Sequence, residues 1–367
     1  MKNILGNYLT VTLFGESHGP CVGATLDGIA PGIKIDMEYL KREMNHRRAT
    51  GELATARKEA DEVQFVSGVK DGYTEGTPLT VLIMNQNVRS SDYNSVAHLA
   101  RPSHADYTAE MKYLGYQDVR GGGHFSGRLT APLVALGAIV KQALEEKGIY
   151  IGTHVASVAD IHDDTLPQEN LKEVIELLNS KDFALLNDAK KEDISKAILN
   201  AKAEGDSLGG VLETVVCGLP AGIGEPYFDS LESTLSHGLF SIGGVKGVEF
   251  GDGFDLTKMK GSEANDPLRM ENGKVVTESN HAGGINGGIS NGMPIVFRTA
   301  IKPTSSIGKA QKTVDYKTME EAELQLEGRH DPCIVLRARA VVDAVTAFVI
   351  ADALCARYGY LYLRSEK

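Results

Sequence analysis

The stretch of residues 132–147 restricts how this chain folds more than any other feature of the sequence. Its apolar side chains recur at helical spacing and cover more than half of the circumference of the helix that they predict. Such a helix has too little polar surface to lie on the outside of a protein, so we expect it to be buried. A second long apolar helix is predicted at 342–358.

Segments that are rich in strand-forming residues and bounded by glycine predict β-strands before and after residues 132–147. They lie at 8–14, 22–28, 62–68, 78–85, 210–217, 245–250 and 294–301. The remaining predicted helices lie at 36–44, 167–179 and 193–204, and the last two are charged and amphipathic. Because strands and helices come in mixed order, this pattern favours a layered α+β architecture over a doubly wound parallel sheet.

The overall composition narrows the class of protein. With 367 residues the chain has room for one large domain or two ordinary ones. A net charge of −11 argues against a surface that binds nucleic acid, although it allows a local basic pocket. Residues 1–6 lack the apolar core of a signal peptide, and no apolar run approaches the roughly 18 residues that span a bilayer. We therefore expect a cytoplasmic protein without a membrane segment.

The cysteines and histidines give no support to a metal site. The four cysteines are widely scattered without a C-x-x-C pair, so neither zinc binding nor a disulfide framework is predicted. No two histidines stand at i, i+4, and no histidine–carboxylate motif with ligand spacing occurs. We therefore expect no bound metal ion.

Several segments place histidine or arginine among glycines and small hydroxyl residues. They lie at 15–19, 101–106, 120–128 and 302–306, together with 329–331. Glycine-rich turns expose backbone N–H groups to an anion, and arginine offers a planar fork that matches carboxylate and phosphate oxygens. None of them is a Walker loop or a G-x-G-x-x-G fingerprint in the required context. These segments therefore predict a site for anionic ligands.

Three residues of these segments suit proton transfer. His18 and His104 each lie in a polar loop flanked by glycine or proline, where an acid–base role near neutral pH is plausible and a hydrogen-bonded structural role is the alternative. Asp331 is either a third such group or a turn residue that starts the next element. Residues 302–306 are either a clamp for a phosphate or ribityl group or simply the end of a strand.

Taken in order, these segments resemble the chorismate synthase family. The similar stretches are 14–19, 57–63, 101–108, 118–123, 243–254, 279–284, 302–306 and 328–333. Several long motifs in a fixed order are far more specific than any one of them, and here they span nearly the whole chain. The resemblance implies a single domain over 1–367, with a β-α-β sandwich of antiparallel sheets around central helices and a site at one end. It also implies a homotetramer.

The activity that the resemblance implies is an anti-1,4-elimination of phosphate from 5-enolpyruvylshikimate 3-phosphate, which yields chorismate. Members of the family require reduced FMN although the reaction causes no net redox change. The protein's task is then to hold two anionic ligands in a dry site and to manage protons. NADPH as the reductant of the flavin is a further expectation.

Roles for individual residues also follow from the resemblance. The implied catalytic residues are His18, which would protonate the departing phosphate, His104, which would protonate or hydrogen-bond the flavin, and Asp331, which would relay the substrate proton. The implied substrate-binding residues are Ser17, Arg48, Arg101, Arg128 and Arg329. The implied flavin-binding residues are Arg47, His124, Phe125, Ser126, Gly287, Lys302, Pro303, Thr304, Ser305, Ser306 and again Arg329.

Two places depart from the family's usual pattern. His124-Phe125-Ser126 stands where the family most often has Arg-Ser-Ser, so a protonated His124 could replace one cation, or Phe125 could pack beside the flavin ring. Leu129 stands in place of a glutamate. The loop at 47–52 is shorter than the usual one and lacks its later arginine, which leaves open whether NADPH reduces the flavin on this protein.

Two rival functions use the same residues. A non-catalytic protein that binds anions or nucleotides would need the glycine and arginine loops but not three groups that handle protons. A flavin-dependent oxidoreductase would consume its reductant in proportion to turnover.

Overall fold

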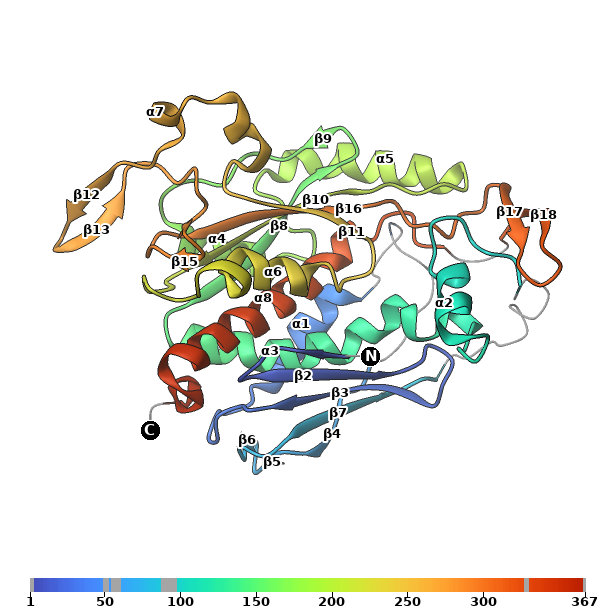
Figure 1. Cartoon of the computed structure of the whole chain (residues 1–367), viewed down its shortest axis with the longest axis horizontal. Helices are drawn as coiled ribbons and strands as arrows, with labels where there is room; N and C mark the ends of the chain where they lie inside the picture. Colours follow the sequence, from blue (N-terminus) through green and yellow to red (C-terminus); the bar gives the residue numbers. More distant parts are fainter. Residues whose placement is uncertain (1–2, 49–52, 54–60, 87–97, 327–329, 366–367) are drawn as a thin grey trace.

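Two five-stranded antiparallel sheets enclose a layer of helices (Figure 1). The computed structural model describes residues 3–48, 53, 61–86, 98–326 and 330–365. The first sheet has the order β1-β2-β3-β7-β4, with strands Ile4–Leu5, Thr10–Gly15, Cys21–Asp27, Leu79–Met84 and Gln64–Ser67. The second has the order β11-β16-β10-β8-β9, with strands Val245–Phe250, Ile295–Ile301, Gly210–Cys217, Tyr150–Val158 and Ile161–His162.

The central layer consists of α1 (Met37–Arg47), α3 (Thr130–Glu146) and α8 (Val335–Tyr358). Helix α3 packs on β3 and β7 of the first sheet, whereas α8 packs on β8 and β10 of the second, and α1 contacts both helices. Strand β16 shows why the sheets bury one face: its residues alternate between buried and partly buried along its whole length. The two sheets thus share one apolar core through the helices between them.

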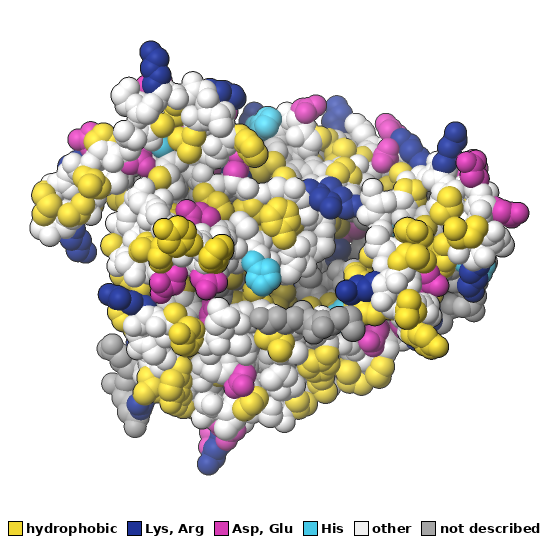
Figure 2. Space-filling model, in the orientation of Figure 1, with side chains coloured by type: hydrophobic (Ala, Val, Ile, Leu, Met, Phe, Trp, Pro, Cys, Tyr) yellow, Lys and Arg dark blue, Asp and Glu magenta, His cyan; other side chains and the backbone are white. Residues whose placement is uncertain are grey.

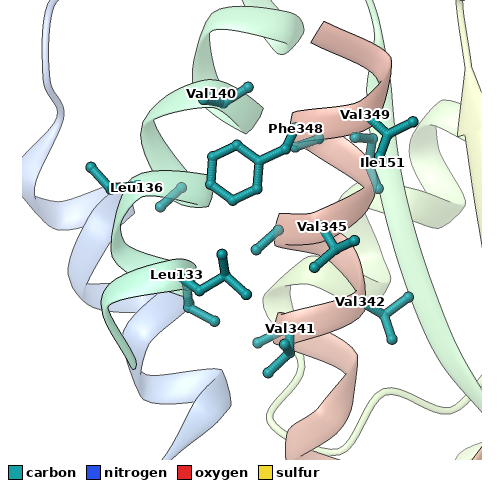
Figure 3. Close-up of a cluster of buried hydrophobic side chains, with 14 of the residues drawn as sticks. Leu133, Leu136, Val140, Ile151, Val341, Val342, Val345, Phe348 and Val349 are labelled. Carbon is teal, nitrogen blue, oxygen red and sulfur yellow. The ribbon is translucent and has the colours of Figure 1, made fainter. Parts of the chain in front are cut away.

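Contacts between α3 and α8 form the centre of this core (Figure 3). The ring of Phe348 extends from α8 toward α3, where Leu136 and Val140 lie. The two helices approach most closely where Gly137 faces Ala344, because a Cβ built on Gly137 would come within 2.3 Å of the Ala344 Cβ. A larger residue at Gly137 would force the two helices apart.

A buried group of charged side chains ties the three central helices together. The ammonium of Lys141 on α3 donates to Asp343 on α8 at 2.9 Å and to Glu43 on α1 at 3.3 Å. Asp343 also accepts a 2.6 Å hydrogen bond from Thr153 of β8. Because removal of one partner from a buried ion pair typically costs about 3–5 kcal/mol, this group holds α1, α3 and α8 in one arrangement.

Shorter elements surround the sandwich. The other α-helices are α2 (Asp106–Tyr113), α4 (Leu171–Ser180), α5 (Lys191–Ala203), α6 (Leu231–Leu239) and α7 (Gly261–Ala264). The hairpins are β5–β6 (Val69–Lys70, Tyr73–Thr74), β12–β13 (Leu268–Glu271, Lys274–Thr277), β14–β15 (Ile285–Asn286, Ile289–Ser290) and β17–β18 (Gln311–Asp315, Glu320–Leu324). The 3₁₀ segments are η2 (Arg120–Phe125), η3 (Gly127–Leu129), η4 (Asp188–Lys190), η5 (Tyr227–Asp229), η6 (Gly253–Lys258) and η7 (Tyr360–Leu363).

The structure confirms the α+β class and the sandwich of antiparallel sheets around central helices. The buried helix predicted at 132–147 is α3, and the helix predicted at 342–358 is α8, which begins seven residues earlier, at Val335. Strand β8 and helices α2 and α6 were not predicted. Within the described ranges, no helix combines the length and the apolar character that a membrane crossing requires.

Candidate active site

Four connecting segments gather at one end of the sandwich. They are the β2–β3 loop, the turn that precedes α2, the 3₁₀ segments η2 and η3, and the stretch that follows β16. Figure 2 shows the surface hollowed between β11 and α2, with Lys or Arg side chains beside the hollow. The predicted histidine and arginine loops thus meet around one concave region.

The rings of His18 and His104 lie against two neighbouring glycines. A Cβ built on Gly121 would come within 2.2 Å of His18 Cε1 and within 3.0 Å of Ser17 Oγ. A Cβ built on Gly122 would lie 3.5 Å from His104 Nε2. The glycine triplet at 121–123 is therefore the contact surface between the two predicted catalytic histidines.

The backbone of this triplet requires glycine. Gly121, Gly122 and Gly123 all have positive φ, at 59°, 85° and 53°, a conformation that residues with a Cβ rarely adopt. The carbonyl of Gly123 accepts a 3.1 Å hydrogen bond from the Ser17 N–H, which fixes the loop of His18 to the triplet. Ser17 is fully buried and His18 is 7% exposed. The glycines thus allow a close approach that the sequence pattern alone left undefined.

His104 is held by a carboxylate and an arginine. Its Nδ1 lies 2.7 Å from Asp106 Oδ1 and 3.1 Å from Arg101 Nη2. Arg101 donates to both oxygens of Asp106, from Nε and from Nη2, each at 2.7 Å. Burial opposes the ionisation of Asp106, but the hydrogen bonds from Arg101 and His104 outweigh it and lower the pKa of that carboxyl well below its usual range.

Residues 302–306 join this group from the end of β16. Arg101 Nη1 donates to Ser306 Oγ at 3.2 Å, and Lys302 Nζ donates to the carbonyl of Ser103 at 2.9 Å. Burial lowers the pKa of Lys302, and the nearby ammonium of Lys246 lowers it further. Both effects disfavour the charged form of Lys302, and a bound anion would offset them. Pro303 and Ser305 lie in the same segment.

Arg47 and Arg128 share one buried carboxylate. Arg47 Nη1 donates to Asp61 Oδ2 at 3.0 Å, and Arg128 Nη1 donates to Asp61 Oδ1. Arg47 Nε also donates to Thr130 Oγ1 at 2.8 Å, so the last residue of α1 contacts the first residue of α3. Asp61 itself is 7% exposed. Part of the positive charge of both arginines is therefore neutralised by the protein.

Asn85 connects the arginines to the loop of His18. Its Oδ1 accepts a 3.0 Å hydrogen bond from Arg128 Nε, and its Nδ2 donates to the carbonyls of Glu16 and Gly19 at 3.0 and 2.9 Å. Arg48, by contrast, is the residue that caps the C-terminus of α1, and it donates to Asn45 Oδ1 at 3.0 Å.

Each residue of the unusual segment at 124–126 makes a contact within the protein. His124 Nδ1 lies 2.9 Å from the carbonyl of Gly15. The ring of Phe125 makes an edge contact with Tyr113, and Phe125 is 42% exposed. Ser126 Oγ accepts a 3.3 Å hydrogen bond from the Arg128 N–H. His124 thus supports the β2–β3 loop, and the exposed Phe125 ring lies near α2.

Asp331 is buried in front of the first turn of α8. Its Oδ1 accepts a 3.2 Å hydrogen bond from the Cys333 N–H, and its Oδ2 lies 2.7 Å from Arg337 Nη2. Burial nevertheless raises the pKa of Asp331 above its usual value. Its neighbour Pro332 accepts from the Leu208 N–H at 2.8 Å, and Ser207 Oγ donates to the carbonyl of Thr304 at 2.7 Å. These contacts link Asp331 to residues 302–306.

One of the predicted flavin contacts lies apart from this group. Gly287 lies in the turn of the β14–β15 hairpin, at the opposite end of β16 from Lys302 (Figure 1). Within one chain it is therefore far from the two histidines, and its flavin contact stays a prediction. Arg329 lies outside the described residues.

Asp61, Asn85 and Asp106 hold predicted site residues in place but were not predicted themselves. Asp61 and Asp106 lie in stretches that resemble the family, and the spacing of Asp106 two residues after His104 was a usable signal. Asn85 and Asp61 could be found only from contacts between distant segments. Among the described residues, no cluster of His, Cys, Asp and Glu has the arrangement of a metal site.

Comparisons with known proteins point to one family. The sequence model of the family described as chorismate synthase matches residues 9–355. The chain is 45% identical over 352 residues to the chorismate synthase of Thermococcus kodakarensis, which covers 96% of this chain and 97% of that protein. It is 44% identical over 363 residues to the chorismate synthase of Methanobrevibacter smithii, with 99% and 98% covered.

A solved structure supports the same assignment. A crystal structure of a chorismate synthase superposes with a TM-score of 0.76 at 30% sequence identity, and the match covers 96% of this chain and 94% of that one. The likeness thus extends over nearly the whole chain. On these matches, the chain belongs to the chorismate synthase family, whose members are carbon–oxygen lyases.

Proposed function

We propose that this protein eliminates phosphate from 5-enolpyruvylshikimate 3-phosphate in an anti-1,4 sense and releases chorismate, with reduced FMN as its cofactor. The observation that carries the proposal is the position of His18 and His104, whose rings lie against the neighbouring glycines 121 and 122. A protein that only binds anions needs no such pair of proton-handling groups. Membership in a lyase family also speaks against the oxidoreductase alternative.

The residues around the histidines fit two anionic ligands. Arg101 and Lys302 bring guanidinium and ammonium groups to this cluster, where Arg101 contacts Ser306 Oγ and Lys302 contacts the carbonyl of Ser103. Within the described part of the chain, Ser17 Oγ, Thr304 Oγ1 and His330 Nε2 are buried atoms without a hydrogen-bond partner. Buried polar atoms are normally hydrogen-bonded, so these three support a polar ligand in the site.

The proposed mechanism assigns each proton transfer to one side chain. Reduced FMN, when bound, supplies electron density that assists the departure of phosphate. His18 donates a proton to the departing phosphate, while Arg101 and Arg128 stabilise negative charge on the substrate. Asp331 takes up the proton that the substrate ring loses, and its raised pKa suits a carboxyl group that exchanges protons closer to neutral pH. Beside bound flavin, the Nε2 of His104 would accept a hydrogen bond when the ring is neutral and would donate a proton when the ring is an imidazolium.

Other family roles enter this proposal as predictions. Ser17, Arg48 and Arg329 would contact the substrate, and Arg47, His124, Phe125, Ser126, Gly287 and residues 302–306 would contact the flavin. Asp61 already offsets part of the positive charge of Arg47 and Arg128. To bind a ligand, either arginine would have to share its hydrogen bonds between Asp61 and the ligand or move away from Asp61.

The decisive experiment is anaerobic turnover with chemically reduced FMN. The proposal expects chorismate and phosphate in equal amounts with only catalytic quantities of reductant, whereas stoichiometric consumption of reductant would favour an oxidoreductase. NADPH is the candidate reductant of the flavin on this protein. Turnover with oxidised FMN and NADPH, compared with turnover with pre-reduced FMN, tests that role directly.

A homotetramer, a cytoplasmic location and a single domain over residues 1–367 stay predictions. The apolar core that both sheets share supports the single domain. Sedimentation equilibrium should give the mass of four chains.

A further inference from the structure

The carboxylate of Asp106 contacts the ring of His104. Asp106 is the first residue of α2, and its Oδ1 lies 2.7 Å from His104 Nδ1. The same oxygen accepts from Arg101 Nη2 at 2.7 Å, and Oδ2 accepts from the Arg101 N–H at 3.0 Å and from Nε at 2.7 Å. Both carboxylate oxygens are thus fully engaged by two neighbouring side chains and a backbone N–H.

The distances select one form of the imidazole. If Nδ1 carried a lone pair, it would face an ionised carboxylate oxygen at 2.7 Å, which is repulsive. If Nδ1 carries the hydrogen, it donates to Asp106 in a short, charge-assisted hydrogen bond. The 3.1 Å approach of Arg101 Nη2 to Nδ1 is the competing contact, because the second hydrogen of Nη2 could be accepted only by a lone pair on Nδ1. The contact with the Asp106 carboxylate is shorter, at 2.7 Å, and Nη2 already donates to that oxygen, so the carboxylate contact decides the assignment. The neutral ring is therefore the Nδ1–H tautomer.

This tautomer leaves Nε2 for the ligand. The Nε2 edge of His104 faces Gly122, where a built Cβ would lie 3.5 Å from Nε2 and 3.4 Å from Cε1. Arg101 continues from Asp106 to Ser306 Oγ at 3.2 Å, so the segment after β16 is fixed to the same carboxylate through the arginine. Asp106 thus connects the orientation of His104 with the segment predicted to hold the flavin.

We propose that Asp106 is a positioning residue: it holds His104 in the Nδ1–H form and keeps Nε2 turned toward Gly122, where His104 acts on a ligand. The part of this inference that concerns turnover depends on the proposed function, whereas the part that concerns the tautomer does not. Orientation of a catalytic imidazole by a buried carboxylate is an established way to secure the correct tautomer.

The test combines a spectroscopic and a kinetic measurement on the full-length protein. Two-bond ¹H–¹⁵N correlation spectra of histidine-labelled protein report which ring nitrogen carries the hydrogen, and the spectrum of His104→Gln assigns the signals. We expect the Nδ1–H pattern for neutral His104 in the unaltered protein. In Asp106→Asn the amide nitrogen should face Nδ1, so the pattern should change to Nε2–H. The kcat should fall by about 10²-fold or more, within the range of acid–base contributions.

Conservative and matched variants complete the design. Asp106→Glu restores the carboxylate and should recover at least about tenfold of the lost kcat. Asp252→Asn removes another carboxylate from a histidine Nδ1, that of His281 at 2.5 Å, and should leave the His104 signals and kcat unchanged.

Two results would overturn the inference. One is an Nε2–H pattern for neutral His104 in the unaltered protein, a measurement that needs no variant to fold. The other is an unchanged tautomer and kcat in a folded Asp106→Asn protein. If instead Asp106→Asn switches the tautomer while His104→Ala retains full kcat, the positioning by Asp106 stands and the proposed catalytic role of His104 fails.

Discussion

Gly121 leaves no room for a side chain beside His18, because a Cβ built there would come within 2.2 Å of the ring's Cε1 and 2.3 Å of its Nδ1. The residue also has a φ of 59°, so both the space and the backbone require glycine. The position of the His18 ring therefore depends on a residue far from it in the sequence.

Replacing Gly121 by Ala should displace the His18 ring and lower kcat by about 10²-fold, since a misplaced acid loses much of its contribution. Steady-state assays with reduced FMN measure the change. Gly127→Ala is the matched control, because it lies in the same stretch and no atom of the described residues comes within 4 Å of its built Cβ. This variant should keep kcat within about threefold. Equal losses in both variants would contradict the role assigned to the contact.

Replacing His104 by Ala should lower kcat by about two to four orders of magnitude if the residue is an acid–base group. The side chain of His104 is partly exposed, so the fold should persist. Circular dichroism and thermal unfolding verify the fold in the same preparation. An unchanged kcat in a folded variant would remove His104 from the mechanism.

Replacing Asp61 by Asn should destabilise the fold, because Arg47 and Arg128 lose their shared carboxylate. Breaking a buried ion pair from one side typically costs about 3–5 kcal/mol. Urea unfolding monitored by circular dichroism gives the difference in the free energy of unfolding. Asp71→Asn is the control: Asp61 and Asp71 both have positive φ, at 47° and 52°, but Asp71 is exposed. Equal stability of the two variants would refute the prediction.

Replacing His46 by Gln should make the protein less sensitive to acid. Burial, with Arg339 and Lys141 nearby, lowers the pKa of His46 to about 3. Between pH of about 6.5 and 3 the unfolded chain binds a proton that the folded chain does not, so acid lowers the free energy of unfolding by up to about 1.4 kcal/mol per pH unit. The variant should lose this slope. His162→Gln, at an exposed position, should retain it.

Replacing Asp331 by Asn should abolish the acid limb of the pH profile of kcat. Because burial raises the pKa of Asp331, the carboxyl becomes protonated, and unable to accept the substrate proton, at a pH above its usual titration range. The rate of the unaltered enzyme should therefore fall as the pH drops through this raised pKa. Asp160→Asn changes an exposed carboxyl and should preserve the limb. A limb that persists in Asp331→Asn assigns it to another group.

The regular elements with a clear apolar period could be predicted from the sequence, and the others could not. Helix α3 was predicted within two residues at each end because its apolar residues repeat without interruption. The start of α8 was missed because Arg337 and Arg339 interrupt the apolar pattern. Arg339 is nevertheless buried, and its guanidinium donates hydrogen bonds to the carbonyls of Leu178 and Lys181. Those bonds depend on a distant part of the chain.

Strand β8 shows the same limit. His154 interrupts its pattern with a polar ring, which is buried between Asp163 at 2.9 Å and Glu213 at 3.0 Å. Thr153 is buried beside Asp343. Polar residues that find partners only in the folded state hide the period of the strand that contains them.

The candidate site was predictable in its chemistry but not in its connections. The motifs indicated His18, His104 and the arginine loops, because those residue types suit protons and anions. That Arg47 and Arg128 share Asp61, and that Gly121 contacts His18, depends on how the sandwich folds its loops together. The role of Asp61 therefore became visible only from the contacts, whereas the spacing of Asp106 two residues after His104 was a signal in the sequence.

The buried group of Lys141, Glu43 and Asp343 has a consequence for the site at some distance from it. A shift of α1 along α3 by a single residue, about 1.5 Å, would already lengthen the contact between Lys141 and Glu43 beyond a normal hydrogen bond. Arg47 follows Glu43 by about one helical turn and meets Thr130 at the start of α3. The position of α1 along α3 thus sets where the Arg47 guanidinium lies relative to Thr130. A variant that breaks the contact between Lys141 and Glu43 should let Arg47 occupy a wider range of positions.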